Sequence, residues 1–251
     1  LGRATKVCEL LTDHDKTYRA VLLLGTETDT EDTTGAVLET KDTSGLTENE
    51  VRDAVCSFIG DYDQIPPMYS ALKVDGKKLY ELAREGKTVE RKARPVKIFD
   101  IRIEKMELPE VTMTVSCSKG TYIRTLCHDI GMKLSVGGCM KELLRTKVGR
   151  FEIADSLTLT DLQKLKEEDR LAEAVLPVEE VFKELLEIRS DTEEMDKLLK
   201  NGNPFRSRAV KDVKNGDKFR VYHSDGTFIG VFKYDEEKHM YYPEKIFLGG
   251  N

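Results

Sequence analysis

The stretch from Val111 to Leu134 changes its apolar period from that of a strand to that of a helix within a few residues. Residues 111–117 (VTMTVSC) alternate apolar and small polar side chains, which is typical of a half-buried strand. We expect Thr121 to cap the first turn of the helix that follows the strand. Apolar residues recur at helical spacing after the turn: Ile123, Leu126, Cys127, Ile130 and Leu134.

The turn between this strand and this helix combines features that suit an anion. Gly120 relaxes the bend, and Lys119 and the first helical N–H groups are predicted to point into one concave junction. Tyr122 and Arg124 join them there. The same residues also fit an ordinary glycine-assisted turn with Lys119 and Arg124 in solvent, and the local pattern by itself favours that ordinary turn.

Alternation and turn residues predict the other strands of the sheet. Residues 93–108 pair with residues 111–117 as an antiparallel hairpin, and residues 17–24 (TYRAVLLL) form a third strand. Residues 25–35 form a glycine-bounded polar loop before another strand that begins at Ala36. The loop is rich in hydroxyls and carboxylates but lacks the ligand spacing of an EF-hand, so a polar connector is favoured over a calcium loop.

Capping and stop signals predict the flanking helices. Thr47 and Glu50 form a capping box that opens a helix, and Gly60 ends it. Two more helices are expected, at residues 79–84 and at residues 139–144, the second leading to a strand near 148–153. The helix that the Thr47–Glu50 capping box opens is expected to bury Val51, Val55, Phe58 and Ile59.

A second, smaller domain is predicted after a composition change at residues 177–188. A helix at 192–200 precedes two strands, at 218–223 and 227–233, joined by an Asp-Gly turn, and a last strand ends at Phe247. The fold class is therefore α+β. We expect a mixed, largely antiparallel sheet with flanking helices in residues 1–178 and a small β-rich domain in residues 185–251.

Composition argues against several kinds of site. The five cysteines form no CxxC pair and the four histidines are not spaced as their partners, so we expect reduced thiols, no metal and no cofactor. No apolar run approaches the roughly 20 residues that cross a bilayer. The start, LGRATKVCELL, is not a signal peptide. We therefore expect no membrane partner and a cytoplasmic protein.

Charge is unevenly distributed along a chain whose net charge is −6. Residues 73–97 carry nine Lys or Arg against four acids, and residues 119–150 carry seven against two, whereas residues 27–63 carry eleven acids against two bases. A single basic run is usually a solvated face. Two such runs beside candidate binding turns, with Tyr80 and Tyr122 interleaved, favour a groove for a polyanion.

Seven strings of the sequence resemble, in order, the motifs of the TruB-type tRNA pseudouridine synthases: LGRATK, DKTYRA, GTETDTEDTTG, QIPPMYSALKVDGKKLYELAREG, ARPV, CSKGTYIRTL and LLRTKVG. The resemblance extends from Leu1 to about Leu176, and the tail resembles, with weaker motifs, the small PUA RNA-binding domain that many members carry. It implies isomerisation of a uridine in the TΨC arm of tRNA (U55) to pseudouridine, by base flipping, aspartate-dependent glycosidic cleavage and reattachment through C5. It also implies a monomer without cofactor.

The resemblance implies roles for individual residues. Tyr18, which would otherwise be read as an ordinary strand tyrosine, matches the tyrosine that stacks on the flipped base and is proposed to help remove the C5 proton. Arg124 matches the arginine that pairs with the catalytic aspartate. Leu143 matches an apolar wall of the base pocket, and Asp32 a polar residue near the base. The other residues expected to bind substrate are Tyr69, Lys73, Lys119 and Tyr122.

The family's nucleophilic aspartate is expected in a GxLDPxATG loop just before the LGxATK string, with which this sequence begins at Leu1. We therefore name no nucleophile, expect a fragment of a longer protein, and expect the 251 residues to bind tRNA weakly without isomerising uridine. Asp29, Asp32 and Asp129 match other family positions. Two alternatives stay open: a non-catalytic tRNA-binding or RNA-folding protein, and an α+β enzyme that uses the Lys119 turn for a phosphorylated metabolite.

Overall fold

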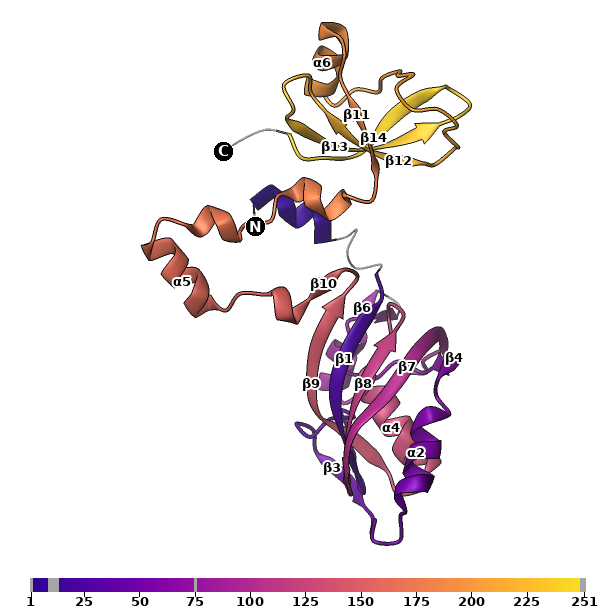
Figure 1. Cartoon of the computed structure of the whole chain (residues 1–251). Helices are drawn as coiled ribbons and strands as arrows, with labels where there is room; N and C mark the ends of the chain where they lie inside the picture. Colours follow the sequence, from indigo (N-terminus) through magenta and orange to yellow (C-terminus); the bar gives the residue numbers. More distant parts are fainter. Residues whose placement is uncertain (1, 9–13, 75, 249–251) are drawn as a thin grey trace. The chain divides into compact units, whose positions relative to one another are not determined.

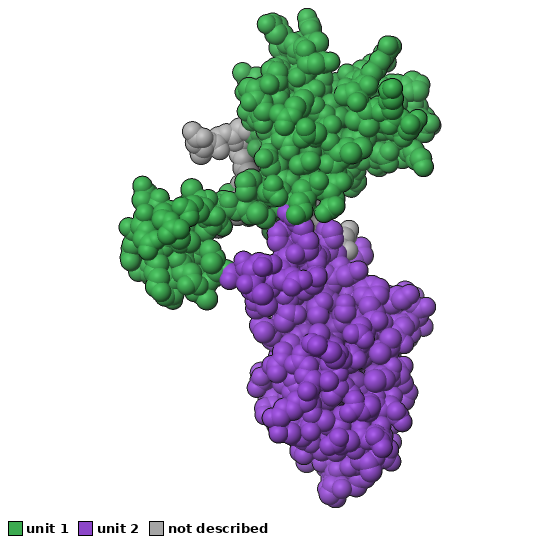
Figure 2. Space-filling model, viewed as in Figure 1, with its two compact units in different colours: residues 1–10, 157–251 green, residues 11–156 purple. Residues whose placement is uncertain are grey.

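In the computed structural model of the protein, residues 2–8, 14–74 and 76–248 are described (Figure 1), so Leu1 of the LGRATK motif lies outside the described residues. The chain divides into two compact units, coloured separately in Figure 2. The large-sheet unit comprises residues 11–156, and the small-sheet unit comprises residues 1–10 and 157–251. The segment that follows Ser156 thus groups with the C-terminal sheet, whereas the sequence placed a boundary at residue 178.

The large-sheet unit is built on six strands in the order β10-β9-β1-β8-β7-β4, and every neighbouring pair is antiparallel. This confirms the predicted α+β class with a largely antiparallel sheet. The hairpin predicted at residues 93–117 is also confirmed, as β7 and β8. The strands are β1 (Lys16–Leu24), β4 (Gly60–Gln64), β7 (Arg94–Glu107), β8 (Glu110–Cys117), β9 (Gly138–Val148) and β10 (Phe151–Glu152).

Two helices, α2 (Glu48–Cys56) and α4 (Ile123–Lys133), lie on one face of this sheet (Figure 1). α4 packs on β1 and β9, and α2 packs on β7. The strands supply alternate residues to the same core, which is why period-two and helical patterns alternate along the sequence. Fully buried members of the core include Leu22, Ile98, Met113, Val115, Leu126 and Ile130.

The capping box predicted for α2 is present, because Glu50 N donates to Thr47 Oγ1 and Thr47 N donates to Glu50 Oε2 at 2.9 Å. Val51 and Val55 are buried as expected. Ile59 is not, since 43% of it is exposed after the helix has ended.

The large-sheet unit also contains shorter strands and helices outside the six-stranded sheet. The polar loop expected at residues 25–35 contains strand β2 (Thr26–Thr28), which pairs with β3 (Val37–Thr40). The predicted helix at residues 79–84 is α3 (Leu79–Arg84), and it follows a small hairpin of β5 (Lys73–Val74) and β6 (Lys77–Lys78). The 3-10 helix η2 (Ile153–Asp155) ends the unit.

The helix expected at residues 139–144 is wrong, because these residues belong to β9. Cys139, Met140, Leu143 and Leu144 have a spacing that a helix could also use, and the local sequence contains good helix formers. In the structure β9 pairs with β1 along its length, through two β-bulges, so the hydrogen-bonding edge of β1 decides the conformation.

The small-sheet unit contains a four-stranded sheet in the order β11-β12-β13-β14, with β11 parallel to β12 and the other pairs antiparallel. Its core is largely aromatic, formed by Phe205, Phe219, Phe232 and Tyr241 with aliphatic neighbours. The predicted helix and three strands are confirmed, whereas β11 was not predicted. The elements are β11 (Leu186–Arg189), α6 (Glu193–Lys200), β12 (Lys218–Tyr222), β13 (Phe228–Asp235) and β14 (Met240–Ile246).

The same unit also contains η1 (Gly2–Val7), α5 (Leu159–Glu167), η3 (Leu171–Ala174) and η4 (Val178–Phe182). Within the ranges that the structure describes, no helix is both long and apolar enough to cross a bilayer.

Candidate active site

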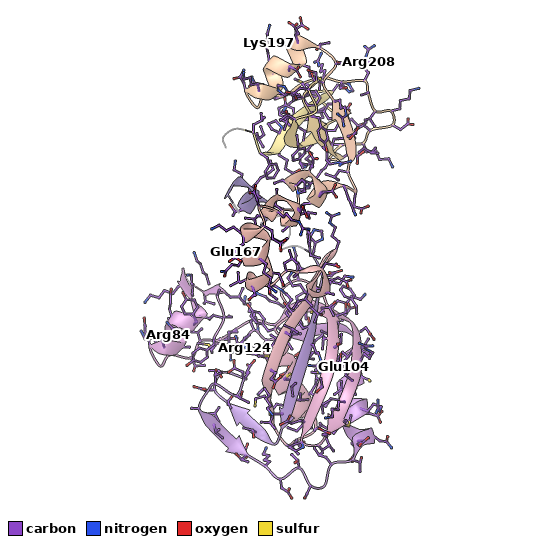
Figure 3. All side chains as sticks on the ribbon, turned by 60° about the vertical axis from the view of Figure 1, so that its left-hand side comes forward. Arg84, Glu104, Arg124, Glu167, Lys197 and Arg208 are labelled. Carbon is purple, nitrogen blue, oxygen red and sulfur yellow. The ribbon has the colours of Figure 1, made fainter. Side chains whose placement is uncertain are left out.

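Arg124 lies in the first turn of α4 and its guanidinium holds three segments of the large-sheet unit together (Figure 3). Nη1 donates to the carbonyl of Thr30 at 3.2 Å and to Asp32 Oδ2 at 3.1 Å, and Nη2 donates to the carbonyl of Tyr69 at 2.7 Å. These bonds use three of the five guanidinium N–H groups. No acceptor is recorded for the other two among the described residues, so the arginine keeps donors for a further ligand.

Asp32 is the carboxylate that faces Arg124, and the two side chains are only 15% and 23% exposed. Its other oxygen accepts from the Thr30 hydroxyl at 2.8 Å, from Thr34 N at 3.0 Å and from the Thr34 hydroxyl. Burial alone would raise the pKa of Asp32, but the hydrogen bonds from Thr34 and Thr30 and the charge of Arg124 outweigh it and hold the pKa below its usual value. Asp32 is therefore ionised at neutral pH.

β9 fixes the backbone that carries Asp32. Residue 32 forms an isolated bridge with Met140, in which Thr33 N donates to Met140 O and Met140 N donates to Glu31 O, each at 3.0 Å. β10 pairs with β9 only at Val148 and Lys147, so the edge near Met140 is open to this loop.

The N-terminus of α4 is capped from another part of the chain. Gln64 accepts from Tyr122 N at 2.8 Å and donates to Tyr122 O at 3.0 Å, while Tyr122 itself is the N-cap residue and offers no side-chain bond. The expected Thr121 cap is wrong, because the Thr121 hydroxyl donates to Ser118 O at 2.9 Å instead. Gln64 is 1% exposed, and nothing in its local sequence identified it.

Tyr18 and Leu143 project from neighbouring strands on the face of the sheet that α4 covers. Tyr18 packs against the core and shares the orientation of Ala20 and Leu22 two and four residues later on β1. Ala20 is the cross-strand partner of Leu143, and directly opposed residues project to the same side. The structure thus places Tyr18, Leu143 and the helix that carries Arg124 on one face.

Tyr18 has a basic neighbour that the sequence did not single out. Arg145 is its cross-strand partner on β9. Burial raises the pKa of Tyr18, although the charge of Arg145 opposes that effect, so the phenol carries its proton at neutral pH.

The cysteines are free, and Cys117, Cys127 and Cys139 are buried. Burial raises the pKa of Cys117 to about 11, which leaves the thiol protonated and poorly nucleophilic at neutral pH. In the described ranges, no three His, Cys, Asp or Glu side chains are grouped as ligands for a metal ion.

The predicted basic segments are partly neutralised by acids from elsewhere in the fold. In residues 119–150, Arg124 pairs with Asp32, Lys141 with Glu110 and Lys147 with Glu152. Lys119 is exposed on the turn, next to Gly120, whose φ of +83° fits the expected bend.

Lys73 lies apart from Lys119, in a pocket of about 310 Å³ beneath the β5–β6 hairpin. The pocket also contains Arg91, Lys92 and Arg94, with Glu90 as its acid. The Nε of Arg91 is buried and makes no recorded hydrogen bond within the described residues, whereas its Nη1 donates to Pro66 O at 3.0 Å. This side of the unit therefore presents a basic hollow.

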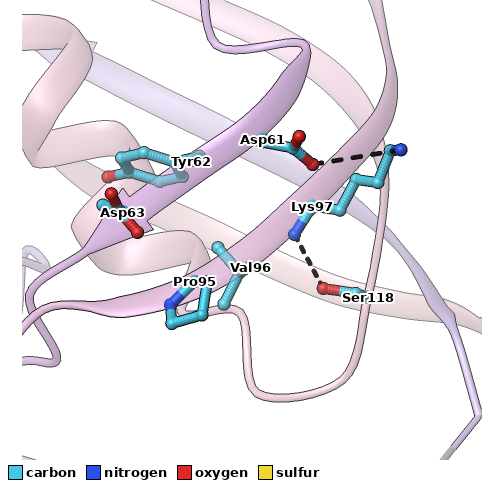
Figure 4. Close-up of a pocket in the computed structure, with 7 residues that line it drawn as sticks. All are labelled: Asp61, Tyr62, Asp63, Pro95, Val96, Lys97 and Ser118. Atoms are coloured by element: carbon cyan, nitrogen blue, oxygen red, sulfur yellow. Dashed lines mark hydrogen bonds and ion pairs between the residues drawn. The ribbon is translucent and has the colours of Figure 1, made fainter.

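A pocket of about 290 Å³ on β4 and β7 carries no comparable chemistry (Figure 4). Its polar contacts are structural, since Lys97 N donates to the Ser118 hydroxyl at 2.8 Å and Lys97 Nζ lies 3.9 Å from Asp61. Asp61 and Asp63 line it without a second cation.

The comparisons with known proteins agree with this fold. Residues 1–123 match the family described as TruB family pseudouridylate synthase (N terminal domain), and residues 124–183 match the tRNA pseudouridylate synthase B C-terminal domain. A crystal structure of a Cbf5-Nop10-Gar1 complex aligns with a TM-score of 0.67 at 24% identity, over 99% of this chain and 71% of that chain. At that identity the structural likeness supports the fold alone.

Curated relatives are much closer in sequence. A protein of Lachnoclostridium phytofermentans named tRNA pseudouridine synthase B is 48% identical over 99% of this chain and 84% of its own length. A protein of Clostridium tetani with the same name is 44% identical over 92% of this chain and 78% of its own length.

The two family matches and the close relatives place the chain in a class of RNA-modifying isomerases. The chain belongs to the TruB family of pseudouridylate synthases.

Proposed function

We propose that the protein converts the uridine at position 55 in the TΨC arm of tRNA into pseudouridine. The observation that carries the proposal is the arrangement of Arg124. A partly exposed guanidinium is held in place by Asp32 and by two carbonyls and keeps two N–H groups for another partner. A planar fork with spare donors suits a carboxylate nucleophile, which such pairing keeps ionised.

We infer that the nucleophile is an aspartate other than Asp29, Asp32 and Asp129, which match other family positions. Asp32 already accepts bonds at both oxygens, and Asp29 Oδ1 accepts from Ala36 N at 2.8 Å. Asp129 is bonded by Tyr62 and lies 3.0 Å from His128 Nδ1. Among the described residues, no recorded contact joins any of these three carboxylates to the two N–H groups that Arg124 keeps for a further ligand.

The remaining site residues accept the flipped base. We infer that the ring of Tyr18 stacks on the uracil released from its ribose and that Leu143 forms an apolar wall beside it. Since the phenol is protonated at rest, it passes its own proton to water before it accepts the C5 proton. The water returns a proton to the uracil nitrogen that has left the ribose, so the phenol and the product are both protonated at the end. An apolar wall also excludes water from the separated base and sugar.

The basic hollow with Lys73 and the exposed Lys119 turn are proposed to contact the phosphates of the TΨC arm. The small-sheet unit is proposed to be a PUA-like RNA-binding domain. We further propose that the protein acts as a monomer in the cytoplasm, with no cofactor. Gel filtration of the full-length protein with and without tRNA tests the monomer.

Tritium release from tRNA transcripts labelled at C5 of uridine tests the function. The full-length protein is expected to release tritium from a transcript with uridine at position 55, and to release none from the same transcript with cytidine there. Release from both transcripts would reject the assigned position. The 251-residue chain is expected to bind tRNA weakly and release no tritium, and turnover by it would place the nucleophile within these residues.

The alternative, a non-catalytic tRNA-binding or RNA-folding protein, predicts salt-dependent tRNA binding by the full-length protein with no tritium release under any condition.

A further inference from the structure

The loop that carries Asp32 is joined to α4 by three side-chain contacts in a row. Asp32 meets Arg124 at 3.1 Å, Glu31 Oε2 accepts from the Thr125 hydroxyl, and Glu27 Oε1 lies 3.6 Å from His128 Nε2. We call these contacts the loop–helix ladder. Because positions 124, 125 and 128 lie within about one turn of each other, residues 27, 31 and 32 of one short segment can reach all of them.

The middle contact is made by a residue in an unfavourable backbone conformation. Glu31 has a φ of +62°, in the left-handed region that glycine, asparagine and aspartate adopt most readily. A glutamate at such a position has a cost that another interaction must offset. Its side chain is partly buried and accepts a hydrogen bond from Thr125, the residue next to Arg124.

The same residue supports Asp32 through its backbone. Glu31 N donates to Thr28 O at 3.2 Å, and Glu31 O accepts from Met140 N at 3.0 Å in the bridge that fixes residue 32 on β9. The Glu31 side chain bonds α4 and the Glu31 carbonyl bonds β9, so the backbone of Asp32 has little freedom. The carboxylate of Asp32 is therefore placed by Glu31 before it contacts Arg124.

We propose that Glu31, through Thr125, is a positioning residue that fixes the Asp32–Arg124 pair and hence the direction in which the guanidinium presents its two remaining N–H groups. The catalytic part of this inference depends on the proposed function, whereas the structural part does not. Glu31 touches neither the base pocket residues Tyr18 and Leu143 nor Arg124 in any recorded hydrogen bond or ion pair of the described chain. Its role is exerted through the contact with Thr125 and through its own backbone bonds to Thr28 and Met140.

Two variants that differ by one methylene test the ladder. Glu31→Asn removes the charge, suits a positive φ and is too short to reach Thr125, whereas Glu31→Gln removes the charge but keeps the length and an acceptor oxygen. The amides of Thr33 and Met140 report the bridge at Asp32, because both donate within it. Hydrogen exchange measures their opening without any need for catalysis.

In Glu31→Asn we expect the amides of Thr33 and Met140 to exchange about tenfold faster than in the wild type, the effect of losing one buried hydrogen bond. Amides of β7 and β8 should be unchanged. Glu31→Gln should stay within about twofold of the wild type. Wild-type exchange in Glu31→Asn, or equally fast exchange in both variants, would overturn the proposal. Glu39→Ala, an exposed carboxylate of β3, is the matched control and should leave both reporter amides unchanged.

The catalytic consequence is read from tritium release by the full-length protein. Glu31→Asn should lower kcat about tenfold with KM for tRNA within about twofold, and Glu31→Gln should restore kcat. A rise in KM that accounts for the whole loss would contradict a positioning role. If no variant and no wild type releases tritium while the exchange results hold, the proposed function fails and the ladder stands.

Discussion

The two units are both built on largely antiparallel sheets, but their buried residues differ in polarity. The buried polar residues of the large-sheet unit are Thr28, Gln64, Ser70 and Thr125, whereas in the small-sheet unit the described residues include Ser190 alone. The core of the small-sheet unit is instead dominated by ring contacts, such as the stacked pair of Phe205 and Tyr241 with centroids 5.1 Å apart.

We interpret this difference as a division of roles: the aromatic core stabilises the small-sheet unit, and the polar network of the large-sheet unit orients the proposed site. A buried polar group lowers stability unless it is fully bonded, so a network such as the loop–helix ladder is retained where it orients a reacting group. Aromatic side chains remove a large apolar area from water without that requirement. We therefore expect substitutions in the small-sheet unit to change folding and substitutions around Arg124 to change catalysis.

The largest effect on folding is expected from Phe232→Ala. Phe232 is fully buried and packs on Phe205 with ring centroids 5.3 Å apart, so removing the ring should lower the free energy of unfolding of the small-sheet unit by about 3–5 kcal/mol. Calorimetry should show a lower transition temperature for that unit and an unchanged one for the other. Phe99→Ala, at a residue that is 43% exposed in the large-sheet unit, is the control and should change stability by less than about 0.5 kcal/mol.

Arg124→Lys, in contrast to Phe232→Ala, should lower turnover and leave the stability of the small-sheet unit unchanged. A point charge cannot bond Thr30, Asp32 and Tyr69 and still present a planar fork, so kcat of the full-length protein should fall roughly 100- to 1,000-fold. Affinity for tRNA, measured by filter binding, should change less than about threefold. Arg84→Lys in α3 is the matched control. Equal losses of turnover and affinity would reject the pairing role.

Tyr18→Phe should keep base stacking and lose the hydroxyl. We expect kcat to fall about 100-fold in single-turnover tritium release, with tRNA binding unchanged, because a proton-transfer group typically contributes at least that much. Normal turnover by this variant would remove Tyr18 from the proton transfer.

Each unit contains a helix capped by threonine, and the caps differ. Thr47 forms a full box with Glu50, whereas Thr192 accepts only one bond, from Met195 N at 3.2 Å. Thr47→Ala should lower the free energy of unfolding by about 1 kcal/mol and Thr192→Ala by less, measured by urea denaturation of each unit's transition. The opposite order would show that the reciprocal bond of the box adds nothing.

The smallest expected effect is a pH dependence confined to the large-sheet unit. The hydrogen bond to Asp129 raises the pKa of His128 against the effect of burial, with Glu31 and Glu27 adding to it. Tyr62, Thr125 and Arg124 complete the polar surroundings of the ladder. A histidine whose folded pKa is raised stabilises the fold fully below its unfolded pKa of about 6.5 and loses that contribution as pH rises through the folded value.

The transition temperature of the large-sheet unit should therefore fall as the pH rises above about 6.5. In the small-sheet unit, the hydrogen bond from Ser224 lowers the pKa of Asp196 to about 2, so its contribution is lost only on acidification below about pH 4. Calorimetry of the wild type and of His128→Gln measures the contrast. An equal fall in His128→Gln would assign the pH dependence to other groups.

Local signals predicted the elements whose stabilising partners are close in sequence. The box at Thr47, the hairpin of β7 and β8 and the helix α6 depend on alternation, caps and turns that a short window contains. The strand β9 was missed because its residues fit a helix equally well until β1 pairs with them. The parallel strand β11 was missed because four residues with an exposed Leu186 carry little pattern.

The sequence by itself determined the fold class and the family, and it predicted Arg124 and Tyr18 as site residues. Only the tertiary structure decided what surrounds them. Asp32 reaches Arg124 across 92 residues of chain, and Gln64 caps α4 across 58. Helix and strand periods depend on neighbouring residues, but the partner of a buried charge or an unpaired N–H group is whichever polar group the fold brings to it. A short stretch of sequence therefore does not predict which distant residue becomes that partner.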